Sequence, residues 1–457
     1  MLYGLLRKST LPTPLSSGII LQQIGGDKKH MKIFEIGRDS QAEIDEALAV
    51  PDRPSSEAVE ETVKEIIADV RARGDQALLE LGQRFDSPNI SSITVSEDEF
   101  QSAYDSIDPR LLDAVRRAKA NIEDYHKKQL RESWIDVKDG IILGQLIRPI
   151  ERVGVYVPGG KAPYPSSVLM TALPAKVAGV PLVVMCSPAQ ADGKINPLML
   201  VAARECGVDA VFKTGGAQAI AAMAYGTAVV PKVDKVVGPG NPFVTEAKRQ
   251  LFGIVGIDMM AGPSEIMIVA DDTAEAHYIA LDLMAQAEHA EDSRAVLVTV
   301  SRALADAVLN EIKRLKPKAA RKDIISESLQ ENGVVMIVRT LDEAAQIVNR
   351  VAPEHLELMV SDPWAMVPLV KNAGAIMLGQ FTPVALGDYA AGPSHTLPTG
   401  GTARFSSPVT VDDFIKKSSL VSYSRDALRE LAATVIDLAQ AEGFEGHANS
   451  VKIRMKE

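Results

Sequence analysis

A chain of 457 residues is too long for one ordinary hydrophobic core, so two or three packed units are expected. A hydrophobic fraction of 46% and a charged fraction of 24% are typical of a soluble globular protein. No apolar run approaches the roughly 18 residues of a membrane span. The net charge of −11 comes without a Lys/Arg cluster, which argues against nucleic-acid binding. Such a chain can still bind an anionic cofactor through backbone amides and helix N-termini.

Residues 1–30 differ in composition from the rest of the chain. They carry several basic residues against a single acid, with Ser, Thr and Pro between them. Their apolar stretch is too short for a secretory signal. Met31, followed by Lys-Ile-Phe-Glu-Ile, is a more natural beginning. We therefore expect residues 1–30 to be a disordered extension.

Helical periodicity marks the region that follows. Between Ser55 and Phe85 apolar residues recur at i, i+3, i+4 and i+7, and a second amphipathic helix opens at Asp108 and includes Tyr125 on its apolar face. His126 stands among lysines and an arginine, which predicts a solvated position. We expect this region to be helical cover without chemistry of its own.

From about Arg152 short apolar runs alternate with helical stretches. Continuous apolar strands between helices indicate parallel sheets covered on both faces. Two such series, divided near residues 259–262, predict an α/β fold with two Rossmann-like, doubly wound domains. The expected strands begin at Val153, Leu182, Ala210 and Lys235 in the first series, and at Glu265, Ala295, Gly333, His355 and Ala375 in the second.

Three glycine-rich turns, at 157–160, 213–218 and 237–241, follow strands of the first series. Each places glycine where a strand passes into a helix, where backbone amides can approach a phosphate. None is the G-x-G-x-x-G of the usual dinucleotide fingerprint. Taken singly, each is an ordinary tight turn, whereas three in one sheet indicate a phosphate-bearing ligand.

Glu354 and His355 form an acid–imidazole pair just after a proline and just before an apolar run. The pair falls where a helix–strand connection ends, and loops and strand ends are where ligands gather in α/β proteins. Both groups can move protons near neutral pH, so they could serve as a catalytic pair. The same pattern also fits a surface glutamate beside a packed histidine.

Residues with nitrogen and oxygen donors are found in the second half of the chain. Such donors, without thiolate, suit a zinc ion that keeps room for a substrate. Gln286 and His289 are three apart in a predicted helix and share a face, whereas Asp388 lies in a segment that its Gly/Pro content marks as a loop. Scattered histidines are usually not metal ligands, so spacing alone does not decide whether these residues form a metal site. The candidates are Gln286, His289, Asp388, His395, Glu442 and His447.

The only two cysteines, Cys186 and Cys206, lack Cys-x-x-Cys spacing, so a disulfide framework or a thiolate metal site is not expected. Both are interpreted as core residues in a reducing cytosol.

Eight motifs occur in one order along the chain: Arg152–Gly160, Thr214–Ile220, Lys235–Asn241, Ala261–Glu265, Gln286–His289, Ala352–Leu356, Gly387–Tyr389 and Gly400–Phe405. Together they closely resemble the histidinol dehydrogenase family, from about residue 35 to the end. The resemblance implies a cytoplasmic, zinc-dependent homodimer, with one zinc per subunit. It would oxidise L-histidinol through the aldehyde to L-histidine with two NAD+, the last steps of histidine biosynthesis. The C-terminal segment would complete the partner's site.

Carried over residue by residue, the resemblance implies a role for each matching position. Glu354 and His355 would be the proton-transfer pair. The NAD+ contacts would be Tyr156, Gln218 and Asn241. The zinc ligands would be Gln286, His289, Asp388 and His447. The substrate contacts would be Ser264, His355, His395 and Glu442 together with the zinc ligands.

We expect four parts of the chain. Residues 1–30 form the extension, and residues 31–155 plus 261–405 form the zinc-binding catalytic domain with a helical N-terminal part. Residues 156–260 form the NAD-binding domain, and residues 406–457 form a dimerisation tail exchanged between subunits.

Other functions remain open to the sequence. One alternative is a paralogous dehydrogenase of another small amino alcohol. Such an enzyme would not need residues that recognise an imidazole and an amine, so the presence of Ser264, Glu442, His395 and His447 argues against it. A zinc hydrolase would leave the glycine turns unexplained, and a non-catalytic metal-binding protein would leave the acid–base pair idle. A thiohemiacetal on cysteine is not expected, because neither cysteine lies near the motifs, so we expect the aldehyde to react as its hydrate.

Overall fold

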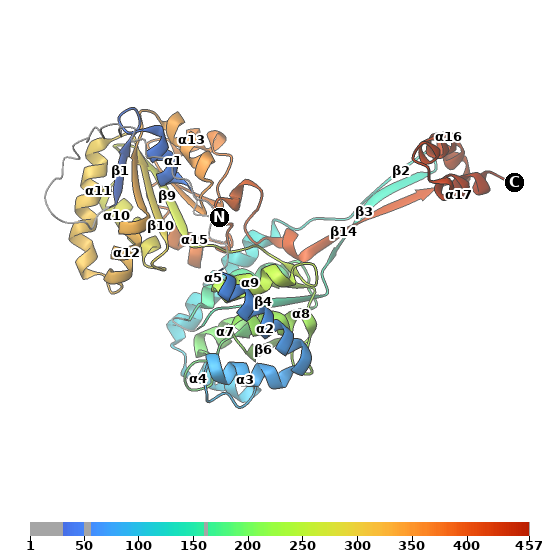
Figure 1. The fold of residues 1–457 in the computed structure, drawn as a ribbon, viewed down its shortest axis with the longest axis horizontal. Helices are drawn as coiled ribbons and strands as arrows, with labels where there is room; N and C mark the ends of the chain where they lie inside the picture. The colour runs from blue at the N-terminus through green and yellow to red at the C-terminus, as the bar shows by residue number, and fades with distance from the viewer. Residues whose placement is uncertain (1–30, 50–55, 160–162, 457) are drawn as a thin grey trace, which may run out of the picture.

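The computed structural model describes residues 31–49, 56–159 and 163–456. The predicted extension at 1–30 and Gly160 of the first glycine turn lie outside these residues. Two parallel sheets form the body of the molecule, and a third, antiparallel sheet extends from it as an arm (Figure 1). Each of the nine apolar runs predicted as strands forms one, so the predicted α/β class is confirmed.

The first sheet has the strand order β6-β5-β4-β7-β8, all parallel. The chain leaves β4 toward β5 and β6, then returns to place β7 on the other side of β4. The sheet therefore has its topological switch point between β4 and β7, where ligands of doubly wound folds bind. The strands are β4 (Arg152–Tyr156), β5 (Leu182–Ser187), β6 (Ala210–Lys213), β7 (Lys235–Val237) and β8 (Gly256–Ile257).

Eight helices cover the two faces of this sheet. One face packs against α4 to α7 and the other against α2, α3, α8 and α9. The helices are α2 (Glu57–Arg73), α3 (Asp75–Phe85), α4 (Glu97–Ser106), α5 (Pro109–Lys127), α6 (Pro165–Val177), α7 (Pro197–Glu205), α8 (Gly216–Tyr225) and α9 (Pro242–Leu251).

The N-terminal helices thus pack differently from the predicted grouping of residues 31–155 with 261–405. The apolar face of α2, including Val63 and Val70, is buried against Ile220 of α8 and its neighbours. Because burial of an amphipathic face holds a helix in place, α2 to α5 belong with the first sheet. Of the described residues up to 155, only 31–49 join the second sheet.

The second sheet has the order β1-β11-β10-β9-β12-β13, all parallel, with its switch point between β9 and β12. One face packs against α10, α11 and α12, the other against α1, α13 and α14. The strands are β1 (Lys32–Glu35), β9 (Glu265–Ala270), β10 (Arg294–Thr299), β11 (Gly333–Ile337), β12 (His355–Met359) and β13 (Ala375–Leu378). The helices are α1 (Gln41–Leu48), α10 (Ala276–Ala287), α11 (Arg302–Leu315), α12 (Lys322–Asn332), α13 (Leu341–Val351), α14 (Pro363–Met366) and α15 (Val384–Tyr389).

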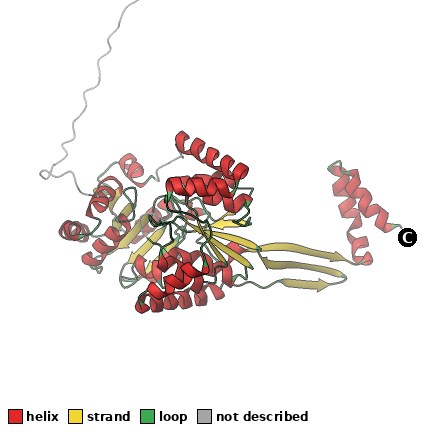
Figure 2. Cartoon of the chain, turned by 90° about the horizontal axis from the view of Figure 1, so that it is seen from below, coloured by secondary structure: helices red, strands yellow, loops and turns green. Residues whose placement is uncertain are grey.

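The arm consists of β2 (Trp134–Lys138), β3 (Ile141–Pro149) and β14 (Ile415–Tyr423), followed by α16 (Arg425–Ala441) and α17 (Glu445–Met455). Its strands are antiparallel in the order β14-β3-β2. Figures 1 and 2 show α16 and α17 at the far end of the arm, away from both sheets. Trp134, Ile135 and Val137 are more than half exposed along it. The sequence predicted a separate C-terminal segment at 406–457 but not the antiparallel strands of this arm.

Helix α5 begins as predicted, because the carboxylate of Asp108 accepts a hydrogen bond from the amide of Arg110 and Pro109 occupies the first turn. The predicted solvated position of His126 is wrong. Its side chain is fully buried, and its Nδ1 lies 2.8 Å from Oε1 of Gln129. His126 continues the buried stripe of Ala118 and Ile122. Of the helices in the described ranges, none is long and apolar enough to cross a lipid bilayer.

Candidate active site

The predicted acid–imidazole pair lies at the amino edge of the second sheet. His355 is the first residue of β12, and Glu265 is the first residue of the neighbouring strand β9. Glu354 stands between the strand and α13, whose C-cap Ala352 has the left-handed conformation (φ 54°). Glu354 and His355 are 6% and 4% exposed, so the surface-glutamate interpretation does not hold.

Hydrogen bonds to Glu265 fix both members of the pair. The amide of Glu265 donates to Oε2 of Glu354 (2.8 Å), and the carbonyl oxygen of Glu265 lies 3.1 Å from Nδ1 of His355. A carbonyl can only accept, so Nδ1 carries the proton in this hydrogen bond. Nε2 of His355 is then the basic nitrogen. It is buried, has no hydrogen-bond partner among the described residues, and lies 3.6 Å from Oδ1 of Asp388.

The electrostatics of the pair follow from burial among carboxylates. Burial by itself lowers the pKa of His355, but the nearby carboxylates of Glu354 and Asp388 outweigh it and raise this pKa well above its usual range. Burial, together with the charge of Glu354, raises the pKa of Glu265 to about 7. The Glu265 carboxyl therefore exchanges its proton near neutral pH, whereas the carboxylates of Glu354 and Asp388 favour the protonated form of His355, an effect that a cation held by Asp388 would offset.

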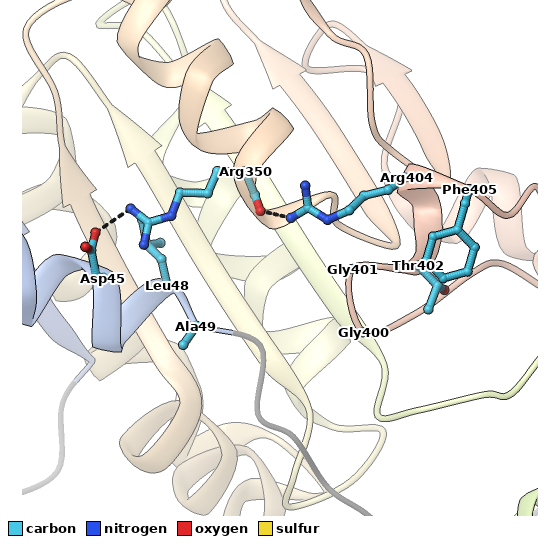
Figure 3. A pocket seen from close by; sticks show the side chains of 9 residues that line it. All are labelled: Asp45, Leu48, Ala49, Arg350, Gly400, Gly401, Thr402, Arg404 and Phe405. Carbon is cyan, nitrogen blue, oxygen red and sulfur yellow. Dashed lines mark hydrogen bonds and ion pairs between the residues drawn. The ribbon is translucent and has the colours of Figure 1, made fainter.

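The turn that carries Glu354 is held by the Gly400–Phe405 motif. The guanidinium of Arg404 donates to the carbonyl oxygens of Asn349 and Arg350 at the end of α13, and Figure 3 shows the hydrogen bond to Arg350. The amide of Gly400 donates to Oε1 of Glu265 (3.0 Å). The two hydrogen bonds of Arg404 satisfy the last carbonyls of α13. Arg350, Gly400 and Arg404 also line a surface cavity of about 400 Å³ (Figure 3). The motif therefore supports the pair from outside the site.

Three of the four predicted zinc ligands lie near this edge. Gln286 is 3% exposed in the last turn of α10, and its Nε2 has no hydrogen-bond partner in the described structure. His289 lies just beyond the helix end and is exposed. Asp388 lies in helix α15 rather than in the predicted loop, and its carboxylate interacts with His289, His355 and His395.

The remaining donors, Glu442 and His447, lie elsewhere. Glu442 caps the end of α16 and His447 is in α17, both exposed at the end of the arm (Figure 1). Within the described ranges, no three acidic, histidine or cysteine side chains are close enough together to hold a metal ion. One chain therefore brings together only part of the predicted donor set.

His395 and Ser264 flank the pair. Nδ1 of His395 is 2.9 Å from the backbone oxygen of Asp388, and its Nε2 is 3.2 Å from Oγ of Ser167 on α6. His395 therefore links the second sheet to the helices of the first. Ser264 directly precedes β9 and is half-buried, with its carbonyl oxygen accepting from the amide of Arg294.

The predicted nucleotide residues lie at the carboxyl edge of the first sheet. Tyr156 ends β4, and its hydroxyl oxygen accepts from the amide of Gly216 (3.1 Å). Asn241 caps α9 after β7, on the other side of the switch point. Gln218 in α8 is buried, and its Nε2 has no hydrogen-bond partner among the described residues. A buried amide without a partner beside a glycine turn fits a polar ligand.

Sequence reasoning missed two acidic groups of the site. Glu265 belongs to the Ala261–Glu265 motif, and an acid that opens an apolar strand was an available signal. Glu357 is 1% exposed and accepts from the amide of Val384 at the start of α15 (2.8 Å). Burial, then the charge of Asp282 on α10, raises the pKa of Glu357 to about 8. Glu357 thus connects β12, α10 and α15, the elements that carry His355, Gln286 and Asp388.

The donor set fits the cofactors that the sequence implies. Gln286, His289 and Asp388 offer amide, imidazole and carboxylate donors, as a zinc site without thiolate would. Among the described residues, Nε2 of Gln286 and Nε2 of His355 are buried there without a hydrogen-bond partner. The carboxyl edge of the first sheet offers glycine turns and the Nε2 atom of Gln218, which has no hydrogen-bond partner in the described part of the chain.

Comparisons with known proteins establish the family of the chain. A family model described as histidinol dehydrogenase matches residues 51–455. Histidinol dehydrogenase of Heliobacterium mobile is 52% identical over 86% of this chain and 93% of its own length, and that of Geobacter sulfurreducens 51% identical over 87% and 94%. The crystal structure of histidinol dehydrogenase from Elizabethkingia anophelis superposes with a TM-score of 0.89 at 33% identity, covering 93% of this chain and 98% of that one. The chain belongs to the histidinol dehydrogenase family.

Proposed function

We propose that this protein carries out the reaction for which its family is named, the NAD+-dependent oxidation of L-histidinol through the aldehyde to L-histidine, in histidine biosynthesis. The observation that carries the proposal is the arrangement at the amino edge of the second sheet. There a buried imidazole has one nitrogen fixed by a backbone carbonyl and the other directed toward Asp388. An acid–base residue of this kind must reach a substrate proton with a free nitrogen.

His355 acts as the base in both oxidations. When bound, zinc positions the amino alcohol and NAD+ accepts the hydride. The Nε2 atom of His355 takes the alcohol proton, while the carbonyl of Glu265 keeps the ring oriented through Nδ1. His355 acts again on the hydrated aldehyde. Zinc would be held by Gln286, His289 and Asp388, with His447 of the partner subunit.

Glu354 activates the water that hydrates the aldehyde. Its Oε2 accepts from the amide of Glu265, which orients the carboxylate beside His355. A cysteine route has no support, because burial raises the pKa of both Cys186 and Cys206. Replacing both cysteines by Ala should therefore leave the turnover number within about twofold, measured as NADH formation, since neither thiolate takes part. Loss of turnover in a folded variant would contradict the hydrate route.

The NAD+ cofactor binds at the switch point of the first sheet, with Tyr156, Gln218 and Asn241 as contacts. The imidazole and amine of the substrate contact Ser264, His395 and the zinc site, joined by Glu442 of the partner subunit.

We also propose that the protein is a homodimer in the cytoplasm in which the arms are exchanged. Glu442 and His447 are exposed at the end of the arm, and apolar side chains such as Trp134 and Val137 are uncovered along it. Exposed apolar surface of this kind marks a partner interface. An isologous dimer would bring the arm of each subunit to the candidate site of the other. The arm would then supply Glu442 and His447, the donors that one chain alone does not bring together.

The direct test is NADH formation at 340 nm from L-histidinol and NAD+, before and after a strong chelator. We expect two NADH for each histidinol, activity lost on chelation, and activity restored by zinc. A protein that binds NAD+ but gives no NADH from histidinol would favour a related amino alcohol as substrate. A protein that neither binds NAD+ nor oxidises histidinol would refute the proposal.

A further inference from the structure

A buried ion pair lies directly under the switch point of the first sheet. The ammonium group of Lys248 on α9 is 2.6 Å from Oδ1 of Asp258, and the two side chains are 2% and 0% exposed. Asp258 follows β8 and begins the segment that crosses to Ser264 and the second sheet. Neither residue is a predicted contact of substrate, zinc or cofactor.

The pair binds both polar backbone groups of one glycine. The ammonium of Lys248 donates to the carbonyl oxygen of Gly238 (2.5 Å), and the amide of Gly238 donates to Oδ2 of Asp258 (2.7 Å). Gly238 has φ +118°, and a Cβ there would clash with the backbone oxygen of Tyr156. Only glycine fits this close approach, and the ion pair fixes which way its carbonyl and amide point.

The position of this glycine matters for the cofactor. Gly238 begins the turn from β7 to Asn241, and it lies against Tyr156 at the end of β4. The turn that Lys248 and Asp258 hold at Gly238 therefore lies between the two predicted NAD+ contacts, since it packs against the backbone of Tyr156 and leads to Asn241. A shift of this backbone would move Asn241 relative to Tyr156.

Stability alone does not explain the pair. Removing two charges from water is costly, and well-packed apolar residues of similar volume often stabilise a protein as much as a buried ion pair does. A charged pair that binds the backbone of a glycine at a ligand-binding edge can instead fix the conformation of that backbone. Each hydrogen bond to a charge is short and directional.

We propose that Lys248 and Asp258 are positioning residues for the dinucleotide, which hold the Gly238–Asn241 turn in the conformation that NAD+ requires. The inference rests on the proposed function, since it takes the switch point of the first sheet as the NAD+ site. It adds two residues that act through the backbone and leave the acid–base chemistry of the second sheet unchanged.

The test is NADH binding to the full-length, zinc-loaded dimer, followed by NADH fluorescence, together with steady-state kinetics. The variant Lys248→Met/Asp258→Asn removes both charges and keeps side chains of similar size, and the new amide oxygen can still accept from the amide of Gly238. We expect the dissociation constant for NADH and the KM for NAD+ to rise about tenfold, which is the loss of roughly one well-formed hydrogen bond to a charge. The KM for histidinol should stay within about twofold.

The chain offers a matched control at the opposite end of the same strand. Lys235 begins β7, and its ammonium is 3.0 Å from Oδ1 of Asp413 in a second, mostly buried pair. The variant Lys235→Met/Asp413→Asn should lower the melting temperature without weakening NADH binding. Equal weakening of NADH binding in both double variants would mean general destabilisation and would overturn the inference.

A conservative variant covers the case in which the double variant does not fold. Lys248→Arg keeps the charge but places a longer, planar head between Gly238 and Asp258, so NADH binding should weaken severalfold with little change in turnover at saturating NAD+. Unchanged NADH affinity in Lys248→Arg would also overturn the inference. Wild-type protein that fails to bind NADH at all would instead refute the proposed function, so the two failures are distinguishable.

Discussion

The two parallel sheets have the same architecture, but their opposite edges carry the candidate site. In the first sheet, Tyr156 and Asn241 follow the carboxyl ends of β4 and β7 at the switch point, where doubly wound folds bind ligands. In the second sheet, Glu265 and His355 are the first residues of β9 and β12, and so lie at the amino ends of the two strands that flank its switch point. The rule that doubly wound folds bind ligands at the carboxyl ends of their strands therefore locates Tyr156 and Asn241. It does not locate Glu265 and His355.

The carboxyl edge of the second sheet explains part of this difference. Where the first sheet has glycine turns, β9 is followed by Asp271, whose carboxylate accepts from the amides of Thr273 (3.0 Å) and Ser361 (2.8 Å). The chain's own carboxylate thus occupies amides that a phosphate would need. The helix α10 then returns antiparallel to β9 and brings Gln286 back to the amino edge. The same βαβ unit therefore places the proposed metal and acid–base residues at its other end.

The largest effect is expected at the second sheet, from His355→Asn. Without Nε2 as base, the turnover number should fall about 10²- to 10⁴-fold in both oxidations. The shorter side chain contacts nothing at the first sheet, so NADH affinity should not change. Stopped-flow NADH formation and fluorescence titration measure the two quantities. A loss of less than threefold would remove His355 from the chemistry.

A smaller effect, confined to one step, should follow Glu354→Gln. The amide oxygen can still accept from the Glu265 amide, so the local geometry is kept, but the side chain can no longer deprotonate water. We expect the second oxidation to slow roughly tenfold or more, and more than the first. Single-turnover experiments started from histidinol and from the aldehyde separate the steps. Equal losses in both would contradict the assignment of Glu354 to hydration.

Mixed dimers test whether the second sheet's site is completed by the arm of the partner. Two inactive variants, His447→Ala and His355→Asn, are unfolded and refolded together. If the arms are exchanged, half of the dimers are mixed and each has one intact site, so roughly a quarter of wild-type activity should return. The separately refolded variants are the control. If activity stays at their level although mixed dimers are isolated, each site is completed within one chain.

The smallest effect is expected in the pH dependence of the melting temperature. The folded-state pKa of Glu357 is raised to about 8 from 4.5 by burial and Asp282. Folding therefore favours its protonated form, so this contribution to stability is full below pH 4.5 and is lost as pH rises through 8. Glu357→Gln cannot ionise, so its melting temperature should fall by a few degrees less than that of the wild type between about pH 6 and pH 9. If the melting temperatures of the variant and the wild type fall by the same amount over this range, Glu357 is not protonated in the folded state.

How far the sequence predicts the molecule depends on where side chains are buried. Nine strands of the two parallel sheets were predictable because most of them are buried on both faces and so read as continuous apolar runs. Strand β14 of the arm, from Ile415 to Tyr423, was not predictable, because it is mostly polar and exposed in this chain and has no core to impose a period. His126 was misjudged from its charged neighbours, although its spacing from Ile122 was the better guide.

The candidate site divides in the same way. The motifs identified Glu354, His355 and Asp388, which the fold brings together. Glu265 and Glu357 act through contacts between strands distant in sequence, and no local pattern encodes such contacts. The helix around Asp388 was hidden by the glycines and prolines that flank it.

The most direct test of the division between the two edges is the dissociation constant for NADH in two matched variants. Gln218→Met removes the buried amide at the first sheet, and Glu354→Gln removes the carboxylate at the second. We predict about tenfold weaker binding for Gln218→Met and an unchanged constant for Glu354→Gln. Weakened binding in Glu354→Gln, with Gln218→Met like the wild type, would place the cofactor at the second sheet and contradict the account.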